Sequence, residues 1–425
     1  MTISRRELIT GTAATALAAS LLPAAAQQVT TLRVSIVPSI FPQMFDEMIK
    51  GFEAAHPDIK IKVDGRFRDQ GDQFQATLRQ GLVNDLPDIT FQGFAYLEPL
   101  KERGITVWLD ERLKRDTRMK GLGIEGPVTS SGTVNGEVHG LGVGMSFPVL
   151  YINADLVRRA GANPDDLPRD WDGILALAKK IHALGGTAQG GFFQYASGGN
   201  WTWIALIESL GGRMMTPDGK LAFTGPEGMK SLEIIRGFGE AGHARNDVSQ
   251  DQARSVFGSG VLGVLFDSGS SLATFEKAAA GRFEIRTLPL PVSPDGRIPA
   301  AGIATALHAR DARRQDAAWA FMVYASGPQG QVQVGRHTGY IPANTIAIRT
   351  PELLGDYYRE RPNYGAAIAS APHNAPWFAF PGDNSIKVSY EIRDHLRDLT
   401  TLKRSPRETM AAIEKSVRAL VPGVG

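Results

Sequence analysis

Residues 148–161, with the sequence PVLYINADLVRRAG, combine a strand pattern and a helix pattern with no loop between them. The first half is apolar, β-branched or aromatic, which favours a β-strand. In the second half Asn153 can cap a helix, and Gly161 stands where that helix would end. A strand that runs directly into a helix is typical of a β-α unit, so this stretch constrains the chain towards an α/β fold.

Strand and helix patterns alternate along the rest of the chain as well. This alternation predicts parallel β-α-β units in the first hundred residues. A hairpin is predicted at Asn135 and Gly136, a dipeptide that favours tight turns. The predicted strands lie at 32–37, 59–64, 88–91, 261–266 and 283–291, and the main predicted helices at 44–57, 72–83, 171–184, 200–212, 226–242, 389–399 and 405–420.

The composition is that of an ordinary globular protein, with 425 residues, 43% hydrophobic, 21% charged and a net charge of +2. A chain of this length can form two or three domains, each with its own core. Because the charge is nearly balanced and scattered, a nucleic-acid or acidic-membrane partner is not expected. The absence of cysteine excludes disulfides and thiolate metal sites.

The first 27 residues are expected to be a signal peptide and not part of the fold. Arg5 and Arg6 precede a weakly apolar run at 9–22, and three alanines at 24–26 fit a cleavage site. The paired arginines resemble a twin-arginine signal, and an ordinary secretory signal is the alternative. With no cysteine to carry a lipid anchor, the mature protein is expected in a Gram-negative periplasm.

Motifs of catalysis are scarce in this sequence. The eight histidines show no HxxxH or HExxH pairing, and no G-x-S-x-G or S-x-x-K motif is found. Residues 258–263, GSGVLG, match a dinucleotide-binding pattern but precede a strand instead of following one. We therefore expect no enzyme activity, cofactor or metal site, although carboxylates distant in sequence can still pair in a fold.

Several motifs occur in an order that is specific as a set: FEAAHPDIKIKV, LPDI, GLGVGMSFPVLYINADLVRRAG, FGSGVLGVLFDSGSSL, LPLP, AAGIATAL, AAWAFMVYASGPQGQ and TGYIPAN. The ordered set resembles the solute-binding proteins of carbohydrate-type ABC transporters. Within that family it is most similar to the branch that binds glycerol 3-phosphate and glycerophosphodiesters. The resemblance covers nearly all of the chain after the signal segment.

The resemblance implies an α/β fold of the type II periplasmic binding protein class. Two lobes would be joined by a hinge of several strands and close on a ligand in the cleft between them. Lobe 1 would contain residues 28–142 plus 288–323, and lobe 2 residues 146–286 plus 326–425. The chain would cross between the lobes near 142–146, 286–290 and 322–327, with the glycines of GLGVGMSFP allowing the first bend.

The function that this resemblance implies is capture of a carbohydrate-type ligand, either a sugar or a glycerol-linked and anionic compound. The protein would act as a monomer and deliver its ligand to the membrane permease of an ABC importer. An exported carbohydrate-active enzyme, a hydrolase or lyase, is the alternative. A binding protein that serves a signalling receptor is a third reading.

The candidate ligand-binding residues come from distant parts of the chain. Lys387 stands where the branch has a phosphate-contacting arginine, and Gln92 with Phe94 stands where it has a glutamate. Gln70 and Asp72 lie where it has a tyrosine. Each aromatic or serine candidate also has a plain alternative, core packing or helix capping. The full candidate set is Gln70, Asp72, Gln92, Phe94, Ser146, Trp203, Ser270, Ser271, Gly302, Tyr340 and Lys387.

Overall fold

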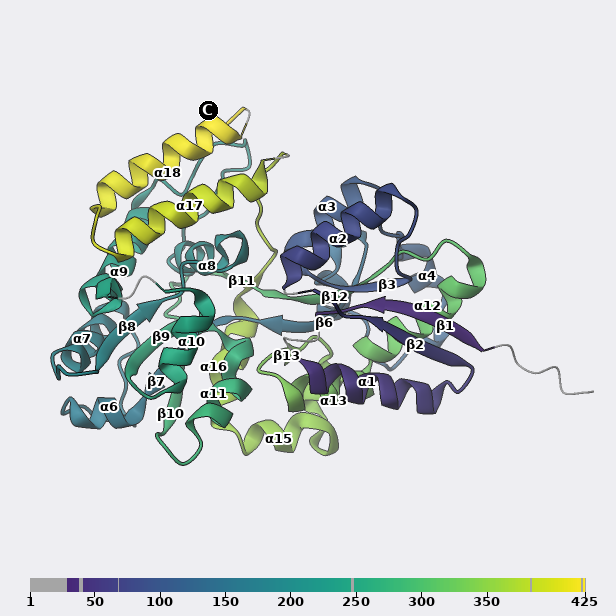
Figure 1. Cartoon of the computed structure of the whole chain (residues 1–425), viewed down its shortest axis with the longest axis horizontal. Helices are drawn as coiled ribbons and strands as arrows, with labels where there is room; N and C mark the ends of the chain where they lie inside the picture. Colours follow the sequence, from purple (N-terminus) through teal and green to yellow (C-terminus); the bar gives the residue numbers. More distant parts are fainter. Residues whose placement is uncertain are drawn as a thin grey trace, which may run out of the picture.

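The computed structural model describes residues 29–37, 41–67, 69–245, 248–382, 384–421 and 423–424. The expected signal segment, 1–27, lies outside the described residues. Two β-sheets stand end to end near the middle of the molecule, each covered by helices (Figure 1). Because the chain alternates between strands and helices in both halves, the α/β class expected from the sequence is confirmed.

The first sheet has six strands in the order β13-β6-β12-β3-β1-β2. Strands β1, β2 and β3 are parallel, whereas β12 is antiparallel to both of its neighbours, β3 and β6. The strands are β1 (Thr30–Ser35), β2 (Ile59–Asp64), β3 (Ile89–Gly93), β6 (Leu141–Ser146), β12 (Ala301–Leu307) and β13 (Ile341–Pro342). Its helices are α1 (Pro42–Ala55), α2 (Gln70–Leu82), α3 (Leu97–Glu102), α4 (Asp110–Arg115), α5 (Pro127–Ser130), α12 (Ala312–Ser326), α13 (Pro328–His337) and α14 (Thr345–Arg349).

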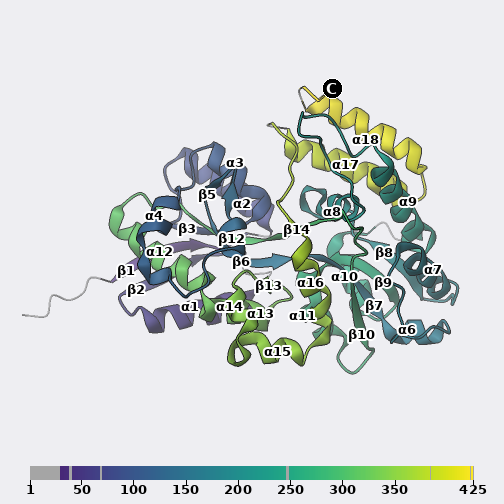
Figure 2. The same ribbon diagram turned by 180° about the vertical axis from the view of Figure 1, so that it is seen from behind.

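The second sheet has four strands in the order β10-β7-β9-β8. These are β7 (Pro148–Asn153), β8 (Gln189–Phe193), β9 (Leu262–Ser268) and β10 (Ile285–Pro289). Its helices are α6 (Ala154–Arg159), α7 (Trp171–His182), α8 (Trp201–Ser209), α9 (Pro226–Glu240), α10 (Gln250–Gly258), α11 (Leu272–Ala279), α16 (Gly365–Ser370), α17 (Ser385–Thr400) and α18 (Pro406–Leu420). Both views place α17 and α18 beside α9 (Figures 1 and 2).

One further helix and two pairs of short strands lie outside the two sheets and their helices. Helix α15 (Asp356–Arg359) follows α14, and β11 (Ile298–Pro299) pairs with β14 (Asn374–Ala375) next to the junction of the sheets. The hairpin of β4 (Thr133–Val134) and β5 (Glu137–Val138) turns at Asn135 and Gly136, as predicted. Both turn residues have positive φ, 51° and 84°, which this turn type requires.

The strand-to-helix junction at Asn153 is confirmed. Its side-chain oxygen accepts hydrogen bonds from the N–H groups of Asp155 and Leu156, both at 3.1 Å, and so caps α6. All six residues of β7 are buried, because β9 and β10 flank it and helices cover its faces. A single residue, the buried Phe147, separates β7 from β6 of the first sheet. The two sheets are therefore joined here by almost no intervening chain.

The chain after residue 326 corrects one expectation. Residues after 326 were expected to return to lobe 2, but α13 packs on α1 and β13 pairs with β6 of the first sheet. The physical reason is Asn344, whose amide nitrogen donates to the carbonyls of Leu122 (2.6 Å) and Ser326 (2.9 Å). The chain touches the second half again at Gly339, whose N–H donates to the Ser270 carbonyl at 3.1 Å, and α16 then packs on β10.

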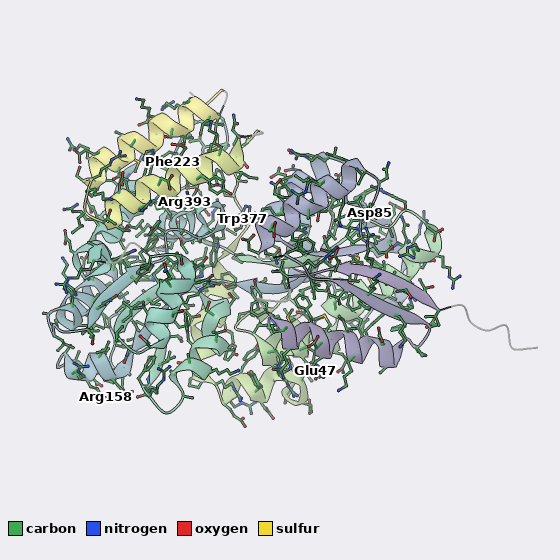
Figure 3. All side chains as sticks on the ribbon, viewed as in Figure 1. Glu47, Asp85, Arg158, Phe223, Trp377 and Arg393 are labelled. Carbon is green, nitrogen blue, oxygen red and sulfur yellow. The ribbon has the colours of Figure 1, made fainter. Side chains whose placement is uncertain are left out.

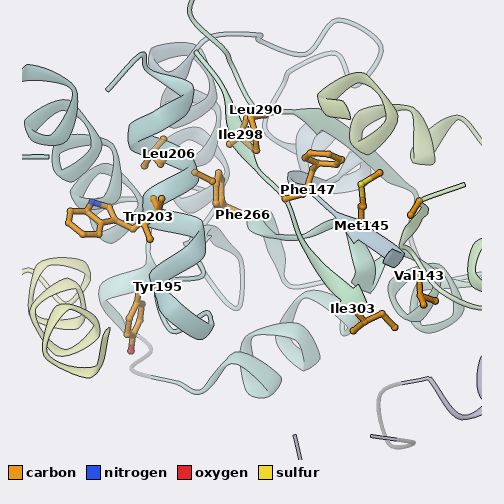
Figure 4. Close-up of a cluster of buried hydrophobic side chains, with 14 of the residues drawn as sticks. Val143, Met145, Phe147, Tyr195, Trp203, Leu206, Phe266, Leu290, Ile298 and Ile303 are labelled. Atoms are coloured by element: carbon orange, nitrogen blue, oxygen red, sulfur yellow. The ribbon is translucent and has the colours of Figure 1, made fainter. Parts of the chain in front are cut away.

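The largest apolar core runs through both sheets (Figure 4). Met145 and Ile303 contribute to it from the first sheet, and Phe266 from the second. Phe147, at the crossing point, lies between these groups. The junction of the sheets is thus packed and apolar rather than a loose linker.

His308, just after β12, predicts a loss of stability in acid. Its ring is buried, Nδ1 donates to the Ile105 carbonyl (3.1 Å), and Nε2 accepts from the Thr90 hydroxyl (2.9 Å), so the ring is held neutral. Burial lowers the pKa of His308 to about 4, against 6.5 for a free histidine. The unfolded chain therefore binds one more proton than the folded chain between these pH values. The stability that the neutral His308 ring gives the fold is complete above pH 6.5 and is lost as the pH falls towards 4.

We expect this group to reduce the free energy of unfolding by about 2 kcal/mol between pH 8 and pH 5. Urea unfolding at the two pH values measures the loss. The variant His308→Gln, which cannot titrate, should show a pH dependence smaller by that amount. An equal loss in both proteins would contradict the assignment.

Candidate functional site

Backbone glycines and three aromatic rings meet where the two sheets join. A Cβ atom placed on Gly302 would lie 2.1 Å from the Gly144 carbonyl oxygen and 2.6 Å from the Phe94 ring. The Tyr340 ring packs on Gly144 in the same way, and Phe41 meets Tyr340 edge-to-face at 5.0 Å. The rings of Phe94, Tyr340 and Phe41 therefore lie along the strand ends. We call these five residues the glycine-aromatic strip.

Three serine hydroxyls connect the two sheets beside this strip. The Oγ atoms of Ser146, at the end of β6, and Ser268, at the end of β9, are 2.7 Å apart. Ser268 Oγ lies 2.7 Å from Ser270 Oγ, and the Ser270 N–H donates to Ser146 Oγ at 3.2 Å. Ser268 also caps the short helical turn that precedes α11. We call Ser146, Ser268 and Ser270 the serine cluster; Ser271, one residue further on, is buried.

Helix α2 and the end of β3 form the wall on the side of the first sheet. Gln70 Oε1 accepts a hydrogen bond from the Gly93 N–H at 2.8 Å, and Asp72 lies half-buried in the first turn of α2. Gln92, by contrast, is fully buried, and its Nε2 lies 3.4 Å from Thr77 Oγ1. Its side chain therefore belongs to the packing beneath α2 and not to the exposed wall.

Tyr96 is a residue of this wall that sequence reasoning missed. Its ring stacks on Phe74, and its hydroxyl would lie 3.4 Å from a Cβ on Gly71. Burial, with smaller contributions from the negative charges of Asp69 and Tyr390, raises the pKa of Tyr96 to about 12. Tyr390, which contributes to this rise, belongs to α17. The sequence did contain a signal for Tyr96, because this tyrosine ends the stretch FQGFAY, which was expected to reach the site through Gln92 and Phe94.

The placement of Trp203 in the site is wrong. Its side chain is fully buried, its indole N–H donates to Ser231 Oγ (3.0 Å), and its ring meets Phe223 edge-on. Helix α9 carries Ser231 and covers the face of α8 that Trp203 occupies. Trp201 is buried as well, with its N–H donated to the Pro299 carbonyl at 2.6 Å.

Trp377 is the half-buried indole near this wall. It packs on Gly199, where an added Cβ would lie 2.7 Å from its ring and where φ is +63°. Figure 3 shows Trp377 in the space between α17 and α2. Its segment, APWFAFPG, has no strand or helix periodicity, so no sequence pattern indicated it.

Lys387 is exposed in the first turn of α17 and forms no ion pair with any residue that the structure describes. The structure thus brings together Phe94, Ser146, Ser270, Gly302 and Tyr340, with Gln70 next to them through Gly93. Contacts do not connect Lys387 to this group. Trp203 and Gln92 lie in the core.

Two further findings concern the described part of the chain only. No group of three or more His, Asp or Glu side chains there is placed to hold a metal ion. No helix there combines the length and apolar character needed to cross a bilayer.

Residues 47–357 match the sequence model of a family described as bacterial extracellular solute-binding protein. The chain belongs to this family. A curated relative, the sn-glycerol-3-phosphate-binding periplasmic protein UgpB of Pectobacterium atrosepticum, is 24% identical over 285 residues. That match covers 64% of this chain and 63% of the relative, so it spans less than two thirds of the relative's length.

Solved structures of solute-binding proteins share the fold. UgpB of Mycobacterium tuberculosis in complex with glycerophosphocholine superposes with a TM-score of 0.79 at 18% identity, over 92% of this chain and 98% of that one. A substrate-binding protein of Listeria monocytogenes in complex with cycloalternan gives 0.78 at 17% identity, over 93% and 100%. This solute-binding protein therefore has the two-lobe type II periplasmic binding protein fold expected from its sequence.

Proposed function

We propose that this solute-binding protein is the periplasmic component of an ABC importer for a carbohydrate-type solute, a sugar or a glycerol-linked compound. It would be exported by a twin-arginine signal, act as a monomer without catalysis, and pass its solute to the membrane permease. The observation that carries the proposal is the glycine-aromatic strip beside the serine cluster. Flat rings pack against the C–H faces of such solutes, and hydroxyls exchange hydrogen bonds with their oxygens.

The relatives support the solute class. One is named for glycerol 3-phosphate, and two solved structures of similar fold contain glycerophosphocholine and cycloalternan. All three compounds offer hydroxyl or phosphate oxygens and apolar C–H surface. These are the groups that the serine cluster and the rings of Phe94 and Tyr340 would recognise.

The two sheets with their helices would act as the two lobes. The first would contain residues 29–146 and 301–349, and the second 148–289 and 365–421. Phe147 and the segments 290–300 and 350–364 would then be the three crossing points about which the lobes rotate. Closure would bring Tyr390 and Trp377 nearer to Tyr96 and cover the strip.

Thermal unfolding against a panel of compounds tests this function. The panel contains neutral sugars, uronates, sulfonated sugars and glycerophosphodiesters. A solute that binds only the folded protein adds about 2.7 kcal/mol of stability at a hundredfold excess over Kd. For a chain of this length we expect the unfolding midpoint to rise by about 3 °C.

If no compound raises the midpoint, the proposed solute class is wrong. The runner-up function, a carbohydrate-active enzyme, is tested with the same compounds. Prolonged incubation followed by analysis of products should return each compound unchanged. Turnover would contradict the binding function.

A further inference from the structure

An ion pair lies directly behind the serine cluster. Asp267, the residue before Ser268 in β9, has a side chain only 1% exposed. Its Oδ2 accepts from Arg254 Nε at 2.7 Å and its Oδ1 from Arg254 Nη2 at 3.2 Å. A buried carboxylate needs such a partner, because an uncompensated charge is costly in the interior.

The pair leaves one nitrogen of Arg254 unused. Nη1 forms no hydrogen bond with any described residue, and the side chain is 29% exposed. The positive charge of Arg254 also acts on Tyr340, where it opposes the rise in pKa that burial causes. The guanidinium is joined to the serine cluster through Asp267, which also accepts the Ser268 N–H, and Nη1 is a charged donor with no acceptor among the described residues.

Asp267 also holds the backbone at Ser268 and so orients the hydroxyls of the serine cluster. Its Oδ1 accepts the Ser268 N–H at 2.7 Å, and the Tyr151 hydroxyl donates to the Ser268 carbonyl at 2.7 Å. The two contacts among the three hydroxyls use two of their three protons. Since Ser146 and Ser268 are buried and Ser270 is half-buried, the third proton can point outward from Ser270.

We propose that Arg254 Nη1 and the Ser270 hydroxyl form an oxyanion subsite, which binds a phosphoryl or carboxylate oxygen of the solute. This inference rests on the proposed function and adds the charge of the solute to it. Both outward groups are donors, while the Asp267 carboxylate lies behind them and is almost fully buried. A guanidinium donates stronger hydrogen bonds to an oxyanion than to a neutral hydroxyl. Arg254, and not the exposed Lys387, would then read the charge.

Matched pairs of charged and neutral probes test the subsite by calorimetry on the whole protein. The pairs are glycerol 3-phosphate with glycerol, and glucuronate with glucose. We expect the charged member of at least one pair to bind tenfold or more tightly than its neutral partner. Arg254→Lys keeps a positive charge opposite Asp267 but has no Nη1. This variant should weaken binding of the charged probe at least tenfold and leave the affinity for the neutral probe unchanged.

Arg314→Lys is the control variant. Arg314 holds Asp88 through Nε and Nη2, as Arg254 holds Asp267. It belongs to α12, and its guanidinium contacts the start of β1, where it donates to the Thr31 carbonyl at 3.1 Å. It should leave both affinities unchanged. Ser270→Ala removes the second donor without touching the ion pair. Ser270→Ala should also weaken binding of the charged probe. It tests the subsite by itself if Arg254→Lys does not fold.

Three results would overturn the subsite. Equal binding of charged and neutral probes excludes it and leaves the proposed function intact. If Lys387→Met abolishes binding of the charged probe but neither Arg254→Lys nor Ser270→Ala does, Lys387 is the residue that recognises the negative charge. Absence of binding by every probe and every compound of the panel refutes both the subsite and the proposed solute class.

Discussion

Replacing Trp203 with alanine is expected to lower the free energy of unfolding by about 4 kcal/mol. The indole is fully buried, so its removal leaves a cavity between α8 and α9. The substitution also takes away the N–H that Ser231 Oγ accepts. In thermal unfolding the midpoint should fall by about 5 °C for a chain of this length.

Trp377→Ala is the matched comparison. This indole is half-buried and sits beside the site instead of inside a core, so we expect a loss of only about 1 kcal/mol. Solute affinity should fall at least tenfold, because a ring platform is lost. If Trp203→Ala keeps the unfolding midpoint of the parent but no longer binds the solute, Trp203 belongs to the binding site after all.

Replacing Gly302 with alanine is expected to cost about 3 kcal/mol and to weaken solute binding at least tenfold. The single added methyl group would stand 2.1 Å from the Gly144 carbonyl oxygen and 2.6 Å from the Phe94 ring. Either β12 must move away from β6 or Phe94 must leave the strip, and both changes disturb the strand ends that form the site. Unfolding and calorimetry measure the two effects.

Gly365→Ala provides the control. Gly365 lies in α16, and an added Cβ there meets no atom within 4 Å. Its stability should stay within about 0.5 kcal/mol of the parent. If Gly302→Ala is equally harmless, the close approach of β12, β6 and Phe94 is not needed for folding or binding.

The parts of the fold that follow from short-range chemistry could be predicted. The cap at Asn153, the turn at Asn135 and Gly136, and the strand at 148–153 depend on residues next to one another in sequence. The long-range pairing of β13 with β6 could not, because the hydrogen bonds from Asn344 to Leu122 and Ser326 link positions up to 222 residues apart.

The candidate site shows the same division. Helical spacing says that Trp201 and Trp203 point in different directions, but not that α9 covers one and the Pro299 carbonyl holds the other. Ser146, Ser270, Gly302 and Tyr340 could be proposed because they belong to motifs of recognisable order. Trp377 and Arg254 could not, because only the folded chain brings them beside those motifs.

The interleaved order of the strands has a consequence for synthesis on the ribosome. The second sheet, β7 to β10, is complete once residue 289 has been made. In the first sheet β12 lies between β3 and β6. The edges of β3 and β6 that pair with β12 therefore stay open until residue 307 has been made, long after β6 ends at Ser146. Open strand edges pair readily with other chains, and such distant pairings form slowly. The half of the protein that emerges first is therefore the last to close, and the nascent chain needs protection from association longest at its oldest strands.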